Sequence, residues 1–303
     1  MKYINTIIIL AFCALVLAPP LRAIDENAGT SGLQFLKIGL GAKQLASGES
    51  ACASAEDSNT IFWNPAGLTR LEKRQISLSH NQWIDGISEQ SVTFNYPGEK
   101  WHFGGGILYL HMGDLTGYDI DAQGKPVKIA DFTSYDMAAI FSCARVYEGV
   151  SVGLNVKLFQ EKIENTQGSG AAIDIGASKS LMENLVAGVV LQNAGTSVKF
   201  IEKETQLPLN IKAGLAYRML SDRLLLTADV NKPNDNAYKG SFGAGYKVAD
   251  SLAFRAGYND KTALNSSITF GLGINISEWT VDYAYVPYGK LGDTHRISLT
   301  TGF

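Results

Sequence analysis

The sequence of 303 residues has little of what marks an enzyme, a disulfide-rich protein or a nucleic-acid-binding protein. It contains three cysteines, and Cys52 and Cys143 are separated by about ninety residues, which does not form a disulfide framework. Acidic residues outnumber basic ones by 29 to 26, so no basic excess is available for nucleic acid. A Cys-x-x-Cys pair, a phosphate loop and a Gly-x-Ser-x-Gly elbow are all missing. We therefore expect no catalysis and no cofactor.

Histidine is also scarce, and its placement argues against a metal site. His80, His102, His111 and His295 are scattered along the chain without the spacing of metal ligands. Structural or interfacial positions are favoured for them. A Ser–His pair of the kind that barrel lipases place on a lipid-facing strand remains open at His295. The adjacent Glu56 and Asp57 are most simply capping or solvated groups.

Only one long apolar run is present, at residues 7–18. Lys2 precedes it and Pro19-Pro20 follow it, a pattern typical of a secretory signal peptide. The run is shorter than the ~20 residues of a membrane-spanning helix. Removing residues 1–23 leaves 24 basic against 29 acidic residues. Lipidation at Cys13 is an alternative, but Phe12 is unsuitable before such a cleavage site. The chain is therefore predicted to be exported.

Residues 24–74 differ in pattern from everything after them. Apolar residues at helical spacing predict a short amphipathic helix interrupted by glycine: Leu33, Phe35, Leu36, Ile38, Leu40 and Leu45. The motif Trp63-Asn64-Pro65-Ala66-Gly67 follows. Pro65 lacks a backbone donor and disfavours helix at Asn64, which predicts a fixed turn behind an aromatic pair. An ordinary loop with a helix start after Asn64 is the alternative, and the residues alone favour it.

From residue 75 onward the hydrophobic period is two. In residues 149–160, for example, Val152, Leu154 and Val156 alternate with Gly153 and Asn155. Dividing the chain at turn signals predicts about fourteen strands of roughly ten residues, an even number as in bacterial barrels. The predicted strands start near Gln75, Ser88, Lys100, Thr133, Gly149, Gly168, Glu183, Pro208, Arg223, Ala237, Ser251, Ser266, Glu278 and Asp293. Longer loops are expected near residues 114–131 and 196–207.

The two faces of these strands differ in polarity. One face carries charges of both signs: Lys157, Asp174, Lys212, Asp229, Lys247, Arg255, Asp282 and Arg296. A solvated sandwich exterior and a barrel lumen could both hold them. The other face carries more apolar surface than one sandwich needs, with aromatics near strand ends at Trp101, Tyr217, Tyr246, Tyr258, Trp279, Tyr285 and Tyr288. A transmembrane antiparallel up-and-down β-barrel is therefore favoured over a soluble sandwich. Glycines on the charged face would make room for something inside it: Gly153, Gly176, Gly214, Gly243 and Gly271.

The last predicted strand shows the same alternation. Ile297, Leu299 and Phe303 occupy its apolar face. We expect these side chains to face lipid and to serve as an insertion signal that is read during barrel assembly.

Two stretches resemble the amino-terminal signature of the PorV/PorQ family of outer-membrane proteins. They are the motif at residues 29–39 and the motif Phe62-Trp63-Asn64-Pro65-Ala66-Gly67-Leu68. The likeness continues in order through Leu207-Pro208-Leu209, Arg255-Ala256-Gly257-Tyr258 and the motif at residues 282–287. That family is related in turn to FadL-type transporters. The resemblance implies an all-β barrel with its amino-terminal segment folded inside the lumen as a plug, or hatch, carrying the Asn64-Pro65-Ala66 turn.

The expected organisation is a signal peptide (1–23), a plug (24–74) and an outer-membrane barrel (75–303). The resemblance implies a non-enzymatic accessory or shuttle component of type IX protein secretion and surface attachment. Its partners would be outer-membrane lipid, the barrel assembly machinery and secreted proteins with carboxy-terminal sorting domains. The alternative is a FadL-like passive channel for hydrophobic small molecules. A purely structural outer-membrane barrel is a third interpretation.

Overall fold

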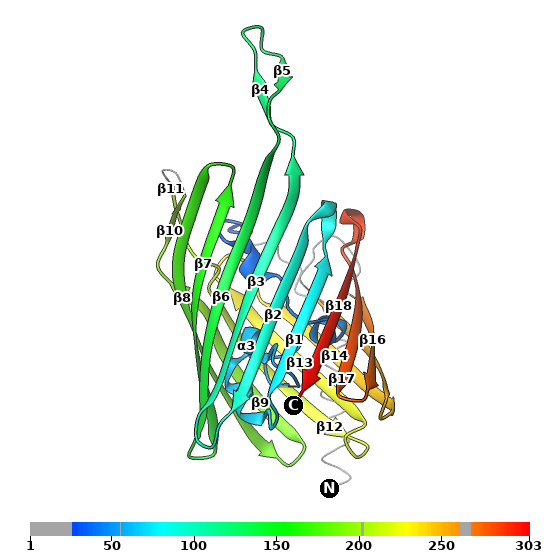
Figure 1. Ribbon diagram of the computed structural model, residues 1–303. Helices are drawn as coiled ribbons and strands as arrows, with labels where there is room; N and C mark the ends of the chain where they lie inside the picture. Colours follow the sequence, from blue (N-terminus) through cyan, green and yellow to red (C-terminus); the bar gives the residue numbers. More distant parts are fainter. Residues whose placement is uncertain (1–25, 55, 201–202, 261–267) are drawn as a thin grey trace.

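A closed antiparallel barrel surrounds the lumen (Figure 1). The computed structural model describes residues 26–54, 56–200, 203–260 and 268–303. The predicted signal peptide, residues 1–23, lies outside the described residues. Within the described residues, fourteen strands pair in the order β1-β18-β17-β16-β15-β14-β13-β12-β9-β8-β7-β6-β3-β2, and β1 closes the barrel by pairing with β18. These residues contain no helix with the length and apolar character needed to cross a bilayer.

The barrel strands follow one another as an up-and-down meander. Their bounds are β1 Gln75–Gln82, β2 Ser88–Pro97, β3 His102–Leu115, β6 Phe132–Tyr147, β7 Val150–Ile163, β8 Thr166–Met182, β9 Leu185–Gly195, β12 Asn210–Met219, β13 Leu224–Pro233, β14 Lys239–Ala249, β15 Leu252–Asn259, β16 Ile268–Ile276, β17 Trp279–Pro287 and β18 Asp293–Gly302. At the end where β1 starts and β18 ends, short turns such as residues 148–149 and 183–184 join the strands. We call this the short-turn end, and the opposite end the long-loop end.

Two small hairpins lie in the long loops. The first is β4 (Tyr118–Ile120) with β5 (Pro126–Lys128), and the second is β10 (Val198–Phe200) with β11 (Lys203–Thr205). In Figure 1 strands β3, β6, β7 and β8 rise above the neighbouring wall, and the β4–β5 hairpin projects beyond them. Short helical turns η3 (Ile84–Gly86) and η4 (Gly289–Leu291) lie at the same end.

The predicted fold class is confirmed, and each predicted strand start lies within two residues of an observed one. Two details differ. The predicted length of about ten residues is too short for β6 and β8, which span 16 and 17 residues. The two small hairpins were not predicted, because their strands are only three residues long and carry no extended alternation.

The outward-facing side chains form an apolar surface. Exposed large hydrophobic residues occur on strands all around the barrel, including Ile76, Phe94, Ile107, Phe141, Leu158, Ile175, Val189, Ile211, Val230, Phe254, Phe270 and Ile297. Water-soluble proteins do not expose such a continuous apolar surface, whereas a bilayer-spanning barrel requires it. Trp101, Tyr246 and Trp279 are exposed near the short-turn end, as expected for an interfacial girdle. Tyr217 was predicted to join them, but it is buried and does not belong to the girdle.

Residues 26–54 and 56–74, which we call the plug, precede the barrel strands, and their buried part packs against the inner face of the wall. The plug contains η1 (Gln34–Lys37), α2 (Ala42–Ala46), α3 (Thr60–Trp63) and η2 (Pro65–Arg70). The single glycine-interrupted helix predicted for residues 33–45 is therefore two short helices. Residues 38–41 between them are extended or turned, and Gly41 adopts φ +84°. Gly48, at φ +66°, ends α2: its N–H donates to the Leu45 carbonyl at 3.1 Å.

A belt of inward-facing glycines lets the plug approach the barrel backbone. The glycine belt comprises Gly153, Gly176, Gly188, Gly214, Gly243, Gly257 and Gly271, one each from β7, β8, β9, β12, β14, β15 and β16. A Cβ at Gly188 would lie 2.5 Å from the Cys52 carbonyl oxygen, and one at Gly243 would lie 2.5 Å from that of Ser47. The prediction that lumen glycines make room inside the barrel is therefore confirmed. They make room for the plug.

Candidate functional site: a cavity between the plug and the wall

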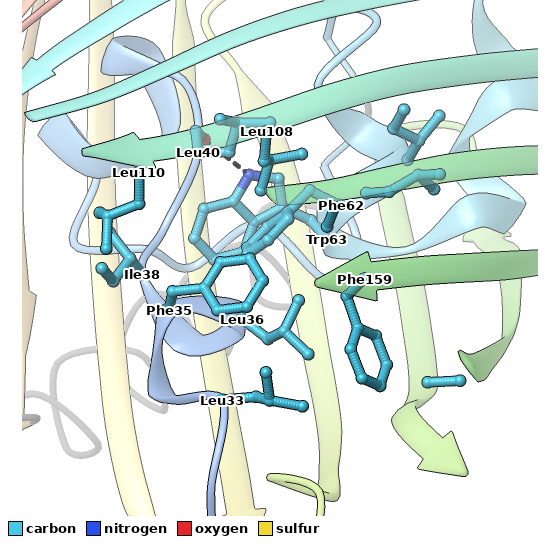
Figure 2. Packing of buried hydrophobic residues seen from close by; sticks show 14 of the residues in the cluster. Leu33, Phe35, Leu36, Ile38, Leu40, Phe62, Trp63, Leu108, Leu110 and Phe159 are labelled. Atoms are coloured by element: carbon cyan, nitrogen blue, oxygen red, sulfur yellow. Dashed lines mark hydrogen bonds between the residues drawn. The ribbon is translucent and has the colours of Figure 1, made fainter. Parts of the chain in front are cut away.

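Phe62 and Trp63 lie at the centre of the lumen, on the short helix α3. Their rings contact edge to face with centroids 5.4 Å apart. The Trp63 indole N–H donates to the Leu40 carbonyl at 3.0 Å, which joins α3 to the earlier part of the plug. Figure 2 shows the pair surrounded by Phe35, Leu36 and other plug residues, with Leu108 and Leu110 of β3 facing it. This cluster is the main apolar core of the protein.

The Asn64-Pro65 turn fixes this pair against the wall. Asn64 is extended (φ −160°), and Pro65 begins η2, where its missing N–H breaks no hydrogen bond. The Asn64 amide nitrogen donates to the Cys52 carbonyl at 2.8 Å, and its oxygen accepts from Ala66 N at 3.1 Å. Ala66 and Gly67 are buried beside the same turn. Both interpretations of this motif therefore hold: it is a fixed turn, and a 3₁₀ helix starts after Asn64.

A cavity of about 240 Å³ opens above the aromatic pair, toward the long-loop end. We call it the outer cavity. Its apolar lining comes from Leu36, Phe62, Trp63 and Pro233. Carboxamides and charged groups complete it: Gln34, Lys37, Gln192, Asn193, Asn210, Lys212, Asn231, Asp235, Asn236 and Lys239. An aromatic floor with polar walls can hold a small, largely apolar molecule and orient it.

A bulge in β9 brings two of these amides inside. The register between β8 and β9 shifts between Ile173 and Ile175, and Asn193 adopts φ +59° there. Gln192 and Asn193 are consequently both buried. Gln192 donates to the Phe62 carbonyl at 2.8 Å, and Asn193 N donates to Asp174 at 2.7 Å. Sequence reasoning missed this bulge, since nothing local in the β9 alternation signals it.

The eight predicted lumen residues all lie on inward-facing strand positions, but the structure does not gather them into one site. Lys157 and Asp174 pair at 2.8 Å, and both side chains are 1% exposed. Arg255 and Asp282 form a second pair at 2.8 Å. Asp229 accepts from Cys52 N at 2.9 Å, which ties the wall to the plug.

The other members lie farther apart. Lys212 lies over the Trp63 ring, with its Nζ 4.7 Å from the centroid. Arg296 is buried near β1 and donates to Asn81 Oδ1 at 2.9 Å. Lys247 is exposed near the short-turn end. Of the set, only Lys212 lines the outer cavity.

Asp235 was not predicted, yet it anchors the first part of the plug. It is 2% exposed and lies in the β13–β14 loop. Lys37 Nζ lies 2.5 Å from its Oδ2, and Ser31 Oγ donates to the same oxygen at 2.5 Å. Burial alone would raise the pKa of this carboxyl, but hydrogen bonds from Lys37 and Ser31 hold the pKa below its usual value. Its position in a loop after Pro233 gave no sequence signal.

The predicted insertion residues share the outward face of β18. Ile297 and Phe303 are exposed, and Leu299 is partly exposed. The Phe303 N–H donates to the Arg74 carbonyl at 3.0 Å, beside the β1–β18 closure. Their role in assembly stays a prediction. Across the described residues, no group of three His, Cys, Asp or Glu side chains could hold a metal ion.

Comparison with known proteins identifies the family to which the chain belongs. A family model described as "Uncharacterised protein family (UPF0164)" matches residues 23–302. The chain belongs to UPF0164. A UPF0164 protein of Treponema pallidum (strain Nichols) is 28% identical over 249 residues, which is 69% of this chain. The chain spans 58% of that relative's length.

Solved structures share the fold of this UPF0164 chain. The Ralstonia pickettii toluene transporter TbuX matches with a TM-score of 0.64 and 16% identity, covering 88% of this chain and 98% of TbuX. The Pseudomonas putida toluene transporter TodX matches with a TM-score of 0.62 and 14% identity, covering 87% of this chain and 96% of TodX. A Pseudomonas aeruginosa FadL homologue gives 0.57 and 12%, covering 86% and 97%. At these identities the likeness shows the fold, and the PorV/PorQ resemblance rests on the sequence motifs alone.

Proposed function

We propose that this UPF0164 protein is an outer-membrane channel for small hydrophobic molecules. The outer cavity carries the proposal: an aromatic and aliphatic floor at the mouth of a plugged barrel. Its volume of about 240 Å³ exceeds the ~150 Å³ of an engineered apolar cavity that binds benzene, so a one-ring molecule fits. The barrels with the same fold include proteins named as toluene transporters.

The apolar surfaces inside and outside the barrel support the same proposal. The apolar outward face suits lipid, which supports a position in an outer membrane. Inside, the cluster around Phe62 and Trp63 extends to the partly buried Trp83, Ile87 and Met112 at the rim of the β1–β2–β3 wall. A small apolar solute would meet protein rather than water along this surface, whereas a charged solute would be desolvated there at a cost.

The test is uptake of toluene into proteoliposomes by the folded barrel. Asn231→Phe would fill the outer cavity from the wall, and Phe62→Ser would remove half of its aromatic floor. We expect both variants to lower the protein-dependent uptake several-fold. Tyr118→Ser, on the exposed β4–β5 hairpin, is the matched control and should leave uptake unchanged. Equal uptake by wild type and Asn231→Phe, in barrels of equal stability, would contradict the channel function.

Type IX secretion is the second candidate, and one structural feature favours it. The β4–β5 hairpin projects beyond the barrel with Tyr118, Ile120 and Val127 exposed, a surface that could receive an exported protein (Figure 1). Proteins with carboxy-terminal sorting domains should then co-purify with the barrel. A deletion strain that exports such proteins normally would exclude this role. A purely structural barrel would show neither toluene uptake nor co-purifying cargo.

A further inference from the structure

A second chamber lies beneath the plug, at the short-turn end. It has a volume of about 410 Å³ and lies between the plug and the wall formed by β12 and β14–β17. We call it the inner chamber. It is separate from the outer cavity and shares no lining residue with it.

Cations from both sides face this chamber. The plug and the residues that lead into β1 supply Lys43, Arg70 and Lys73, and the wall supplies Arg218, Lys247 and Arg255. Among the described residues, two carboxylates line it, those of Glu56 and Glu72. The chain as a whole carries a net charge of −3, so this lining is opposite in sign to the protein's overall charge.

Half of these cations are already paired, and half are not. Lys43 lies 3.6 Å from Asp57, Arg255 lies 2.8 Å from Asp282, and Arg218 lies 3.9 Å from Glu56. Within the described part of the chain, Arg70, Lys73 and Lys247 form no salt bridge. Among the described residues, the Arg70 guanidinium donates to a neutral partner, Ser180 Oγ, at 3.2 Å.

The positive charges of the plug and of the wall influence one another across the inner chamber. Burial and the nearby Arg218 both lower the pKa of Arg70, which reports like charges facing each other there. Burial alone would raise the pKa of Glu56, but Lys43, Arg255, Arg218 and Lys247 together hold it low. A concave site lined mainly by one sign of charge concentrates ions of the opposite sign.

We propose that the inner chamber binds a small multivalent anion bearing phosphate groups, which bridges the plug and the barrel wall. Guanidinium groups suit phosphate because their planar forks match its oxygens, and the lysines add point charge. The bound anion turns repulsion between Arg70 and the wall cations into attraction, so it holds the plug in its seat. Free phosphates and the headgroups of anionic lipids share this chemistry. The site is independent of which solute crosses the outer cavity.

The test uses the folded chain, residues 24–303, in zwitterionic micelles. Pyrophosphate binding is measured by titration calorimetry, and hydrogen exchange of residues 42–70 is measured with and without it. We expect wild type to bind pyrophosphate and to exchange more slowly when it is bound. Arg70→Gln with Lys247→Gln should weaken binding at least tenfold. Lys125→Gln with Lys128→Gln, on the distant β4–β5 hairpin, removes the same charge and should bind as wild type does.

Two further measurements distinguish loss of the anion site from a folding defect, and free anions from lipid headgroups. Arg70→Lys with Lys247→Arg keeps the charge and should retain most of the binding, which separates the anion site from a folding defect. Micelles doped with phosphatidylglycerol should compete with pyrophosphate if headgroups reach the chamber, and leave its binding unchanged if only free anions do. The proposal is overturned if wild type binds neither anion at low salt, or if wild type and the Gln double variant bind alike. It is also overturned if bound anion leaves the exchange of residues 42–70 unchanged.

Discussion

Asn64 occupies the space that a side chain at Gly176 would need. A Cβ built on Gly176 would collide with Asn64 Oδ1 and lie 3.1 Å from Pro65 Cδ. The absence of a side chain at Gly176 in β8 therefore leaves the room that the Asn64 turn of the plug occupies. The two residues are 112 positions apart in the sequence. The sequence of the barrel strand and the sequence of the plug turn are therefore complementary.

Replacing Gly176 with valine should unseat the plug while the barrel still closes. The new side chain overlaps Asn64, and overpacking of this kind costs about 1–3 kcal/mol. Asn64 would also lose its bond to the Cys52 carbonyl. Thermal unfolding in detergent and hydrogen exchange of residues 42–70 would measure the effect. Gly240→Val is the control, because a Cβ there meets nothing closer than a Phe242 ring atom at 3.8 Å. Equal exchange in both variants would contradict the match between Gly176 and Asn64.

Cys52 should be a sensitive reporter of plug seating. It is 2% exposed, and burial, with the nearby Asp229, raises the pKa of its thiol. The reactive thiolate should therefore stay scarce even at pH 9, where an ordinary cysteine of pKa ~8.5 is mostly ionised. In a Cys143→Ser chain of residues 24–303, maleimide should label Cys52 slowly across this range and rapidly after denaturation. A Ser197→Cys thiol on the exposed β9–β12 loop, in a chain without Cys52, supplies the reference. Labelling of native Cys52 that follows the reference titration would contradict the buried position.

Features of the fold and the site that depend on local sequence patterns could be predicted, whereas features that depend on contacts between distant segments could not. Strand starts such as Gln75, Ser88 and Asp293 were predicted to the residue, because alternation is a local signal that the lipid-facing side enforces. The glycine belt was predicted in part for the same reason. Trp63 and Asn64 were identified as a motif, but the cavity above them was not.

The cavity and its anchors depend on contacts between distant segments. Asn193 takes its unusual backbone conformation in a bulge that Asp174, on the neighbouring strand, stabilises. Asp235 forms an ion pair with Lys37, which lies 198 positions earlier in the sequence. Tyr217 was assigned to the girdle by its place near a strand end, but it is buried. Such positions follow only from the assembled barrel.

The Lys37–Asp235 pair should make the first part of the plug sensitive to acid. The pKa of Asp235 is lowered in the folded protein, so the ionised form stabilises the fold. That stability is fully present above the unfolded pKa of ~3.9 and is lost as the pH falls through the folded value. The protection of residues 29–37 against hydrogen exchange, taken relative to the intrinsic rate at each pH, should fall below about pH 4. Asp235→Asn should show the same reduced protection already at pH 7, a loss of about 1–3 kcal/mol. Asp119→Asn, on the exposed β4–β5 hairpin, should show no such change.

Phe303→Asp should impair barrel assembly. The Phe303 side chain is 68% exposed on the lipid-facing side of β18, and a carboxylate there would face hydrocarbon or the interface. The fraction of heat-modifiable, folded barrel in outer membranes should fall, whereas Phe303→Tyr should assemble normally. Normal assembly of Phe303→Asp would remove the proposed insertion signal.

The central claim is that the plug, and not the barrel wall, closes the lumen. The most direct measurement is the flux of small sugars through proteoliposomes that contain either the full chain or a chain lacking residues 29–74, each verified as folded by heat modifiability. We predict low flux for the full chain and a large increase without the plug, because the barrel has no other described segment across its lumen. Equal flux through the two folded barrels would contradict the account.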